Sequence, residues 1–245
     1  MVKVGVLGNG KLGKIIIDAL NKGLAPECEF IGAASRSIGI TVFDLIEDGA
    51  EIIIEAATPE ALKGCIVDIL KNGVSVIPLS TGIFADPDCF EEVYKAAKGS
   101  GAKVYLPHGA EGAFDLASTF SLLPEMKATV IQNIPDHSGI KTGTFIDEMP
   151  REFKGSVLEG FALSPAHLNV AIETAIACGG FDNTSFEIRV PEDGRMGFSL
   201  ELENDRAEAT LTVKSKPVPG GPPDRSMIAL STISLLNRIT SPISF

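Results

Sequence analysis

A glycine-rich turn near the amino terminus is the feature that most constrains the fold of this chain. Residues 2–7, VKVGVL, form an apolar run typical of a buried strand, and Gly8, Gly10 and Gly13 follow it at the spacing Gly-x-Gly-x-x-Gly. Apolar residues then recur at helical spacing over residues 11–23. This order of strand, glycine turn and helix is typical of a turn that binds the pyrophosphate of a dinucleotide. The alternative is a tight turn between strand and helix that binds no ligand.

Each glycine has its own physical role in such a turn. Gly8 permits the tight turn, Gly10 lets a pyrophosphate approach the backbone, and Gly13 lets the helix lie close to the strand. The free N–H groups and the dipole at the start of the helix favour phosphates. We therefore predict that the cofactor contacts Gly8, Asn9, Gly10, Lys11, Leu12 and Gly13.

The end of the second predicted strand, residues 28–35, indicates which dinucleotide is bound. NAD sites usually place an acidic residue there to bond the ribose 2′-hydroxyl, whereas this chain has Ser35 and Arg36. A hydroxyl and a guanidinium can bind a 2′-phosphate, which a carboxylate would repel. We predict NADP(H) as the preferred cofactor, with NAD(H) possible. The alternative is that Arg36 is a solvated surface charge.

Strands and helices alternate through the first hundred residues. Apolar runs predict further strands at residues 51–57, 74–80 and 102–107, with helices at residues 58–73 and 86–101. Connections of this length imply right-handed crossovers and a parallel sheet. The predicted fold class is α/β, with a Rossmann-type doubly wound parallel sheet.

The pattern changes after residue 107. Residues 108–119 predict a loop that enters a helix, and residues 164–180 predict another helix. Several further segments, some with alternating apolar and polar residues, predict strands at 127–134, 155–162, 184–190, 196–204 and 207–216. These elements predict a second α+β domain with a mainly antiparallel sheet.

A turn-rich segment, residues 217–224, leads into a final predicted helix at residues 225–239. We expect this helix to pack back on the first domain. The predicted domains are therefore a dinucleotide-binding domain, residues 1–107 with 218–245, and a substrate and dimerisation domain, residues 108–217.

Composition argues against several classes of partner. The 245 residues include 32 acidic side chains against 21 of Lys and Arg, a net charge of −11, which would repel nucleic acids and anionic membranes. No apolar run reaches the roughly 20 residues that span a bilayer, and the N-terminus lacks the features of a signal peptide. We expect no nucleic-acid partner and no membrane association.

The cysteines indicate a protein of a reducing compartment, and the cysteines and histidines together indicate no metal site. Cys28, Cys65, Cys89 and Cys178 are scattered and form no C-x-x-C pair. Reduced thiols in a cytoplasmic protein fit this pattern better than disulfides, which are the alternative. With only three histidines and no clustered thiols, we expect no metal.

Several segments of the chain resemble the L-aspartate dehydrogenase family. They include EAATPE at residues 55–60, LSTGIFAD at 79–86, AKVYLPHGAEGAFD at 102–115 and FKGSVLEGFALSPAHLNVA at 153–171, and the similarity runs nearly end to end. The resemblance implies a two-domain, typically dimeric enzyme that oxidises aspartate to iminoaspartate with NAD or NADP, or runs the reverse amination.

The resemblance also implies which residues face the nicotinamide and its ribose. By position these are Ala57 and Thr58 after one strand and Ser80, Thr81 and Gly82 after the next, where open α/β sheets bind ligands. The alternative for Thr58 is a helix N-cap, and the two roles are compatible.

Two more residues are implied by family motifs. Gly109 and Ala110 match a family loop, S-G-A-I-G-G, which places the backbone at Ala110 close to the nicotinamide. Asn169 matches the second asparagine of a family motif, P-K-N-x-N-V-A.

Departures from the family lie at the substrate site. The family has an N-x-H pattern on the strand that aligns with residues 195–203, where this chain has Gly197, Phe198 and Ser199. The loop also gains Glu111, either as an acid in the pocket or, as we expect, as a charge favoured by a helix N-terminus.

Hydrolysis or formation of an imine requires proton transfer, and the group that transfers the proton is usually a histidine. The catalytic candidates are therefore His108, His137 and His167, and the alternative for each is a surface or core histidine. The segment of His137 and Lys141 is also similar to a pattern of dihydrodipicolinate reductase, whose substrate is a cyclic dicarboxylate.

The sequence thus predicts an NAD(P)-dependent oxidoreductase acting on the CH–NH2 or imine group of a small amino acid or oxo acid, assembled as a homodimer. The alternatives are a reductase of a cyclic imine or another carbonyl acid, and a nucleotide-binding protein without catalysis.

Overall fold

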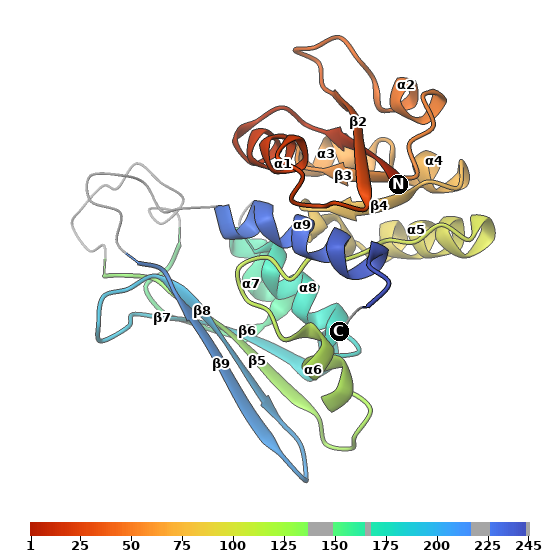
Figure 1. Ribbon diagram of the computed structural model, residues 1–245. Helices are drawn as coiled ribbons and strands as arrows, with labels where there is room; N and C mark the ends of the chain where they lie inside the picture. Colours follow the sequence, from red (N-terminus) through yellow and green to blue (C-terminus); the bar gives the residue numbers. More distant parts are fainter. Residues whose placement is uncertain (137–148, 165–167, 217–225, 244–245) are drawn as a thin grey trace. The chain divides into compact units, whose positions relative to one another are not determined.

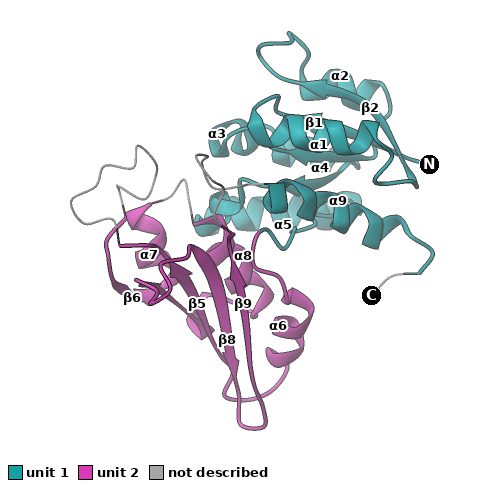
Figure 2. Ribbon diagram, turned by 60° about the vertical axis from the view of Figure 1, so that its left-hand side comes forward, with its two compact units in different colours: residues 1–109, 225–245 teal, residues 110–224 magenta. Residues whose placement is uncertain are grey.

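A computed structural model describes residues 1–136, 149–164, 168–216 and 226–243 of the chain. The chain divides into two compact units, which are residues 1–109 with 225–245 and residues 110–224 (Figure 2). Within the described ranges, no helix is long and apolar enough to cross a membrane.

Unit 1 is built on a parallel sheet with the strand order β2-β1-β3-β4 (Figure 1). Its strands are β1 (Val2–Leu7), β2 (Cys28–Ala34), β3 (Ile52–Glu55) and β4 (Ser75–Pro78). Its helices are α1 (Lys11–Asn21), α2 (Val42–Glu47), α3 (Pro59–Lys63), α4 (Ile66–Lys71), α5 (Pro87–Ser100) and α9 (Ser226–Thr240), with a 3₁₀ turn, η1 (Thr81–Ala85).

Helices pack on both faces of this sheet, because alternate residues of each strand face opposite ways. Val6, Ile54 and Ile77 face α1 and α9 in one buried cluster. On the other face, Gly5 lies against Ile53 and against Leu45 of α2. The predicted doubly wound parallel sheet is thereby confirmed.

Helix α9 completes the core of unit 1, although it follows unit 2 in the sequence. It packs beside α1, and Ala229 and Leu236 are fully buried in the same cluster as the strands (Figure 1). The side-chain N–H of Asn237 donates to the carbonyl of Leu24 at 2.9 Å. The last helix therefore packs on the first unit, as the sequence predicts.

Three elements of unit 1 differ from the sequence predictions. The predicted helix at 58–73 is broken between α3 and α4 at Gly64 and Cys65. The predicted strand at 102–107 is reduced to a parallel bridge between Val76 and Val104. Helix α2 was not predicted, although Thr41 and Asp44 form a capping box at its start.

Unit 2 is a five-stranded sheet of order β6-β7-β5-β8-β9. Its strands are β5 (Lys127–Asn133), β6 (Phe153–Ser156), β7 (Thr184–Arg189), β8 (Gly197–Glu203) and β9 (Glu208–Lys214). Only the β5–β7 pair is parallel among these strands, so the predicted mainly antiparallel sheet is confirmed. The helices are α6 (Phe114–Phe120), α7 (Val157–Leu163) and α8 (Asn169–Ala177), with a 3₁₀ turn, η3 (Phe181–Asn183).

The predicted strand at residues 155–162 is wrong for most of its length. Strand β6 ends at Ser156, which caps α7 in a capping box with Glu159. The backbone N–H of Ser156 donates to the carboxylate of Glu159 at 2.8 Å, and the N–H of Glu159 donates to the Ser156 hydroxyl at 3.2 Å. Gly160 then faces the ring of Phe186, where a larger residue would collide with it.

Candidate functional site

The glycine turn joins β1 to α1 at the carboxyl edge of the parallel sheet. Gly8 has a φ of +117°, and a Cβ there would collide with the carbonyl of Ala56. A Cβ on Gly13 would collide with the carbonyl oxygen of Gly8. A Cβ on Gly10, the N-cap of α1, would meet nothing within 4 Å. The space beside Gly10 is therefore open where a pyrophosphate would lie.

Backbone hydrogen bonds gather the ends of the first three strands around this turn. The N–H of Gly8 donates to the carbonyl of Ala34 at 2.8 Å, and the N–H of Ala56 donates to that of Leu7 at 2.8 Å. Asn9 and Leu12 are half-buried beside the turn, while Lys11 is exposed. The predicted phosphate-binding residues thus lie together at the edge where ligands bind in open α/β sheets.

Glu55, the last residue of β3, is fully buried and joins two of the predicted cofactor segments. Its carboxyl accepts hydrogen bonds from the N–H of Ala57 at 2.7 Å and from the N–H of Leu79 at 3.2 Å. It also accepts from the N–H and the hydroxyl of Ser80, both at 2.9 Å. Burial raises the pKa of Glu55, while these four donors favour its ionised form.

Glu55 was missed in the sequence analysis. The sequence feature that could have identified it is an acidic residue at the C-terminal end of an otherwise apolar buried strand, IIIE. A buried carboxyl in that position requires partners, and the nearest available donors belong to the neighbouring strand end.

The structure gives Thr58 the capping role. Its hydroxyl accepts from the N–H of Ala61 at 3.2 Å at the start of α3. Thr58 and Ala57 are both exposed at the carboxyl edge. The predicted N-cap role of Thr58 is therefore confirmed. Because Thr58 remains exposed, this role is compatible with contact to a ligand.

Ser80, Thr81 and Gly82 form the turn from β4 into η1 and are all buried. Phe84 in η1 stacks edge-on against Phe90 of α5, with ring centroids 6.0 Å apart. Lys63 of α3 pairs with Asp86, the N-cap of α5, at 2.7 Å. The turn is thus held by contacts on both sides.

Ser35 and Arg36 lie in the turn that follows β2. The Ser35 hydroxyl accepts from the N–H of Ile38 at 3.3 Å and lies 3.0 Å from the hydroxyl of Ser37. The N–H of Ser35 donates to the carbonyl of Ile40 at 3.0 Å. The Arg36 side chain is exposed. The turn therefore presents two hydroxyls and a guanidinium together at the sheet edge.

Of the three candidate histidines, the structure describes only His108. His108 is half-buried in unit 1, and its pKa is lowered by burial and by the positive charge of Arg238 in α9. It is therefore neutral at neutral pH. His137 and His167 lie outside the described residues.

Glu111 does not lie at a helix N-terminus, so that expectation is wrong. Helix α6 begins only at Phe114, after Gly112 and Ala113 turn the backbone with φ values of +103° and +61°. The carboxyl of Glu111 is 4% exposed and lies 2.5 Å from the hydroxyl of Thr174 in α8. It is a buried acid of unit 2.

Unit 2 also contains the predicted residues Ala110 and Asn169 and the strand β8, on which the resemblance implies a histidine in the family. Ala110 precedes Glu111 and is half-buried, and Asn169 is the first residue of α8. On β8, the Ser199 hydroxyl lies 3.0 Å from that of Thr212 and accepts from the Asn133 amide at 3.4 Å. A neutral polar cluster thus occupies this part of the sheet.

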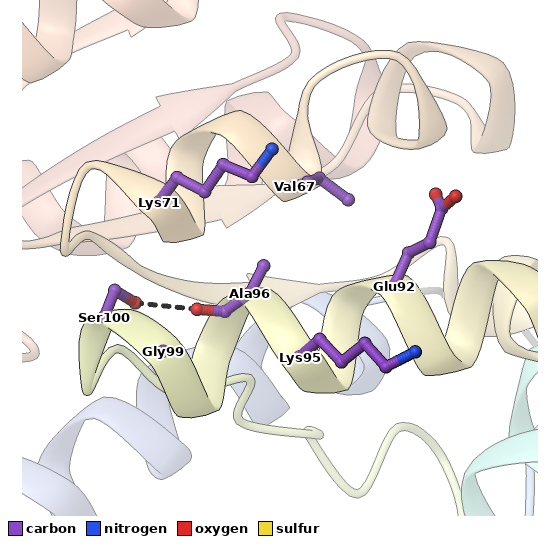
Figure 3. A pocket seen from close by; sticks show the side chains of 7 residues that line it. All are labelled: Val67, Lys71, Glu92, Lys95, Ala96, Gly99 and Ser100. Atoms are coloured by element: carbon purple, nitrogen blue, oxygen red, sulfur yellow. Dashed lines mark hydrogen bonds between the residues drawn. The ribbon is translucent and has the colours of Figure 1, made fainter.

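A groove of about 600 Å³ separates α4 from α5 (Figure 3). Val67 and Lys71 line it from α4, and Glu92 and Lys95 line it from α5. Lys71 and Ser100 are the last residues of their helices. None of the predicted cofactor residues lines this groove.

Two sequence families match the chain in succession. The family described as "Homoserine dehydrogenase, NAD binding domain" matches residues 8–107, and "Aspartate dehydrogenase, C-terminal" matches residues 131–239. The L-aspartate dehydrogenase of Methanosarcina barkeri is 26% identical over 99% of this chain and 98% of its own. That of Methanococcoides burtonii is 27% identical with the same coverage.

Solved structures share the fold. The aspartate dehydrogenase of Thermotoga maritima matches with a TM-score of 0.76 at 24% identity, covering 100% of this chain and 99% of its own. A dihydrodipicolinate reductase from Paenisporosarcina matches with a TM-score of 0.55 at 12% identity, covering 98% and 95%.

A parallel sheet with a glycine turn at its carboxyl edge, followed by a mixed-sheet unit, defines an NAD(P)-dependent oxidoreductase. Because the two family matches lie in succession along the chain and the relatives align end to end, the chain belongs to the aspartate dehydrogenase family. The family predicted from the sequence is confirmed.

Proposed function

We propose that this protein interconverts L-aspartate and its oxo acid plus ammonia, with NADP(H) preferred over NAD(H). The observation that carries the proposal is the carboxyl edge of the unit 1 sheet. There the open space beside Gly10 lies at the same edge as the Ser35–Arg36 turn and the strand ends joined by Glu55.

The residues of this edge suit the parts of a dinucleotide. Backbone N–H groups from Gly10 to Gly13 suit the pyrophosphate, and Ser35 with Arg36 suits a 2′-phosphate through a guanidinium and a hydroxyl. Thr58 and the turn that starts at Ser80 suit the nicotinamide ribose. When bound, the cofactor accepts or donates the hydride.

The chain's own contribution is to orient the reactants, exclude water and move protons. We propose that unit 2 binds the substrate, with Ala110 and Asn169 near the reacting groups. His137 and His167 are the proposed proton donors. His108 is a weaker candidate, because its described electrostatic partner is Arg238.

A second candidate is reduction of a cyclic imine or another carbonyl acid. It is favoured by the change at the family's histidine position, where Ser199 joins a cluster of neutral polar groups. A cyclic imine substrate would require neither hydrolysis nor formation of the imine, and so none of the proton transfers of that step.

We also propose a homodimer in the cytoplasm. Support for the dimer is the resemblance to the aspartate dehydrogenase family, whose members are typically dimers. Support for the compartment is four cysteines without disulfides. Sedimentation analysis tests the dimer, because a monomer at working concentration would contradict it.

The decisive experiment for activity is oxidation of NADPH and NADH with ammonia and a panel of 2-oxo acids and cyclic imines. Turnover with oxaloacetate and a preference for NADPH is the expected result. Turnover only with a cyclic imine favours the second candidate. Cofactor binding without turnover across the panel would indicate a protein that has lost catalysis.

A further inference from the structure

We propose that Glu111 is a neutral carboxylic acid that fixes the loop of residues 110–113 to helix α8, and that it is a positioning residue for the reaction. The inference rests on the proposed function for its link to activity. It concerns a residue at which this chain departs from the family loop S-G-A-I-G-G, where the matching residue is isoleucine.

The hydrogen-bond geometry calls for a proton on Glu111. The Thr174 hydroxyl lies 2.5 Å from one carboxyl oxygen of Glu111 and 2.9 Å from the carbonyl oxygen of Val170. If Glu111 is ionised, its carboxylate and the Val170 carbonyl are both acceptors only. The Thr174 hydroxyl has a single proton and can donate to only one of them. With a proton on Glu111, both contacts are satisfied, since the acid donates to Thr174 and Thr174 donates to Val170.

The second carboxyl oxygen supports the same protonation state. Oε1 of Glu111 is buried and has no hydrogen-bond partner among the described residues. A negative charge on an oxygen without donors would be costly, whereas a neutral carbonyl oxygen there costs much less. Glu55 illustrates the opposite case, because four donors surround its carboxyl.

The surroundings of Glu111 also favour its neutral form. Burial raises its pKa to about 8, and the hydrogen bond with Thr174 lowers it by less. Cys178, at the C-cap of α8, interacts electrostatically with Glu111 and has a pKa raised by burial to about 11, so it is neutral in this range. Glu173, a buried neighbour of Thr174 in α8, is a second acidic group of this helix.

The loop needs such an anchor. Ala113 has a φ of +61°, a left-handed conformation that is unfavourable for a residue with a Cβ, and Gly112 before it has a φ of +103°. The chain from Glu111 through Thr174 to Val170 holds this backbone against the first turns of α8, which begins at Asn169. Ionisation of Glu111 would remove the donor and place a charge in this contact.

The test compares Glu111→Gln, which keeps a neutral hydrogen-bond donor, with Glu111→Ile, which keeps burial without the donor. Glu203→Gln, an exposed carboxylate of β8, is the matched control. Unfolding by denaturant is measured across the pH range without cofactor, and kcat, KM and NADPH affinity are measured with the best substrate of the panel.

Relative to Glu111→Gln, we expect the stability of the wild type to fall as pH rises from about 4.5 to about 8, because Glu111 keeps in the folded state a proton that it loses in the unfolded state. Glu111→Gln lacks this contribution. It should also keep kcat near neutral pH, while kcat of the wild type relative to this variant falls about tenfold at one pH unit above the pKa of Glu111. Glu111→Ile should fold with lowered kcat at every pH.

Two results would overturn the proposal. Identical pH dependence of stability in the wild type and Glu111→Gln would show that Glu111 is not neutral. Full kcat in Glu111→Ile would show that the contact does not position the loop. If no substrate is turned over at all, the proposed function fails, and the stability measurements still decide the protonation of Glu111.

Discussion

Glu55 ends β3 and Ser80 lies just beyond the end of the neighbouring strand β4. Two hydrogen bonds of 2.9 Å join them, one from the Ser80 N–H and one from its hydroxyl to the Glu55 carboxylate. The same carboxylate also accepts a hydrogen bond from the N–H of Ala57, which follows Glu55 at the end of β3. One buried acid thereby sets the relative positions of two segments predicted to face the nicotinamide ribose.

Replacement of Glu55 should therefore impair both folding and cofactor binding. Glu55→Ala leaves buried donors without an acceptor, and we expect a loss of roughly 2–4 kcal/mol in the free energy of unfolding. Glu55→Gln should lose less. Denaturant unfolding and NADPH titration measure the two effects.

A matched control for this change lies at the other end of the same segment. Glu51 is exposed and accepts a hydrogen bond from the N–H of Lys3 at 2.9 Å, so Glu51→Gln should be near neutral in both assays. In a double-mutant cycle, Glu55→Ala and Ser80→Ala should couple by about 1–2 kcal/mol. Additive losses would contradict the direct contact.

Two glycines of the turn should separate stability from binding. Gly13→Ala places a Cβ against the carbonyl of Gly8, and it should cost at least about 2 kcal/mol of stability. Gly10→Ala meets open space at a φ of −79°, so it should fold normally. It should nevertheless lower NADPH affinity by about tenfold or more, because its methyl group occupies the pyrophosphate position. Unchanged affinity in Gly10→Ala would argue against the site.

Arg36 should decide between the two nicotinamide cofactors. A charge-assisted bond to a 2′-phosphate contributes about 1.5–3 kcal/mol, so Arg36→Ala should lower NADPH affinity roughly tenfold to a hundredfold. NADH affinity should change little, since NADH has no 2′-phosphate. Fluorescence titration of both cofactors measures this, and a preference of the wild type for NADH would reject the predicted specificity.

The packing of α9 can be tested apart from the site. Leu236 is fully buried against the unit 1 core, and Leu236→Ala should cost about 2–5 kcal/mol of stability. Leu230 on the same helix is 39% exposed, and Leu230→Ala should remain within about 1 kcal/mol of the wild type. Equal losses would mean that α9 does not contribute to this core.

The carboxyl edge of unit 1 was predictable from the sequence for a geometric reason. In a parallel sheet every strand ends at the same edge, so the turns after β1, β2, β3 and β4 come together without knowledge of side-chain contacts. Thr58 followed by Pro59 likewise marks a helix start locally. The prediction needed only the order of strands and helices.

Other features depend on contacts that no local pattern contains. Nothing near Glu111 indicates that Gly112 and Ala113 turn the backbone so that its carboxyl meets Thr174, 63 residues later. The start of α7 was missed for a different reason. Its capping box, Ser156 with Glu159, is a local signal, but the apolar residues around it also fit a strand.

The position of α9 in the sequence has a consequence for biosynthesis. On the ribosome, β1 and α1 emerge first, whereas the helix that covers them is translated only after all of unit 2. The apolar surface shared by α1 and the sheet therefore stays uncovered while more than a hundred residues are added. Nascent chains stalled before residue 226 should bind chaperones through this surface, and full-length chains should not.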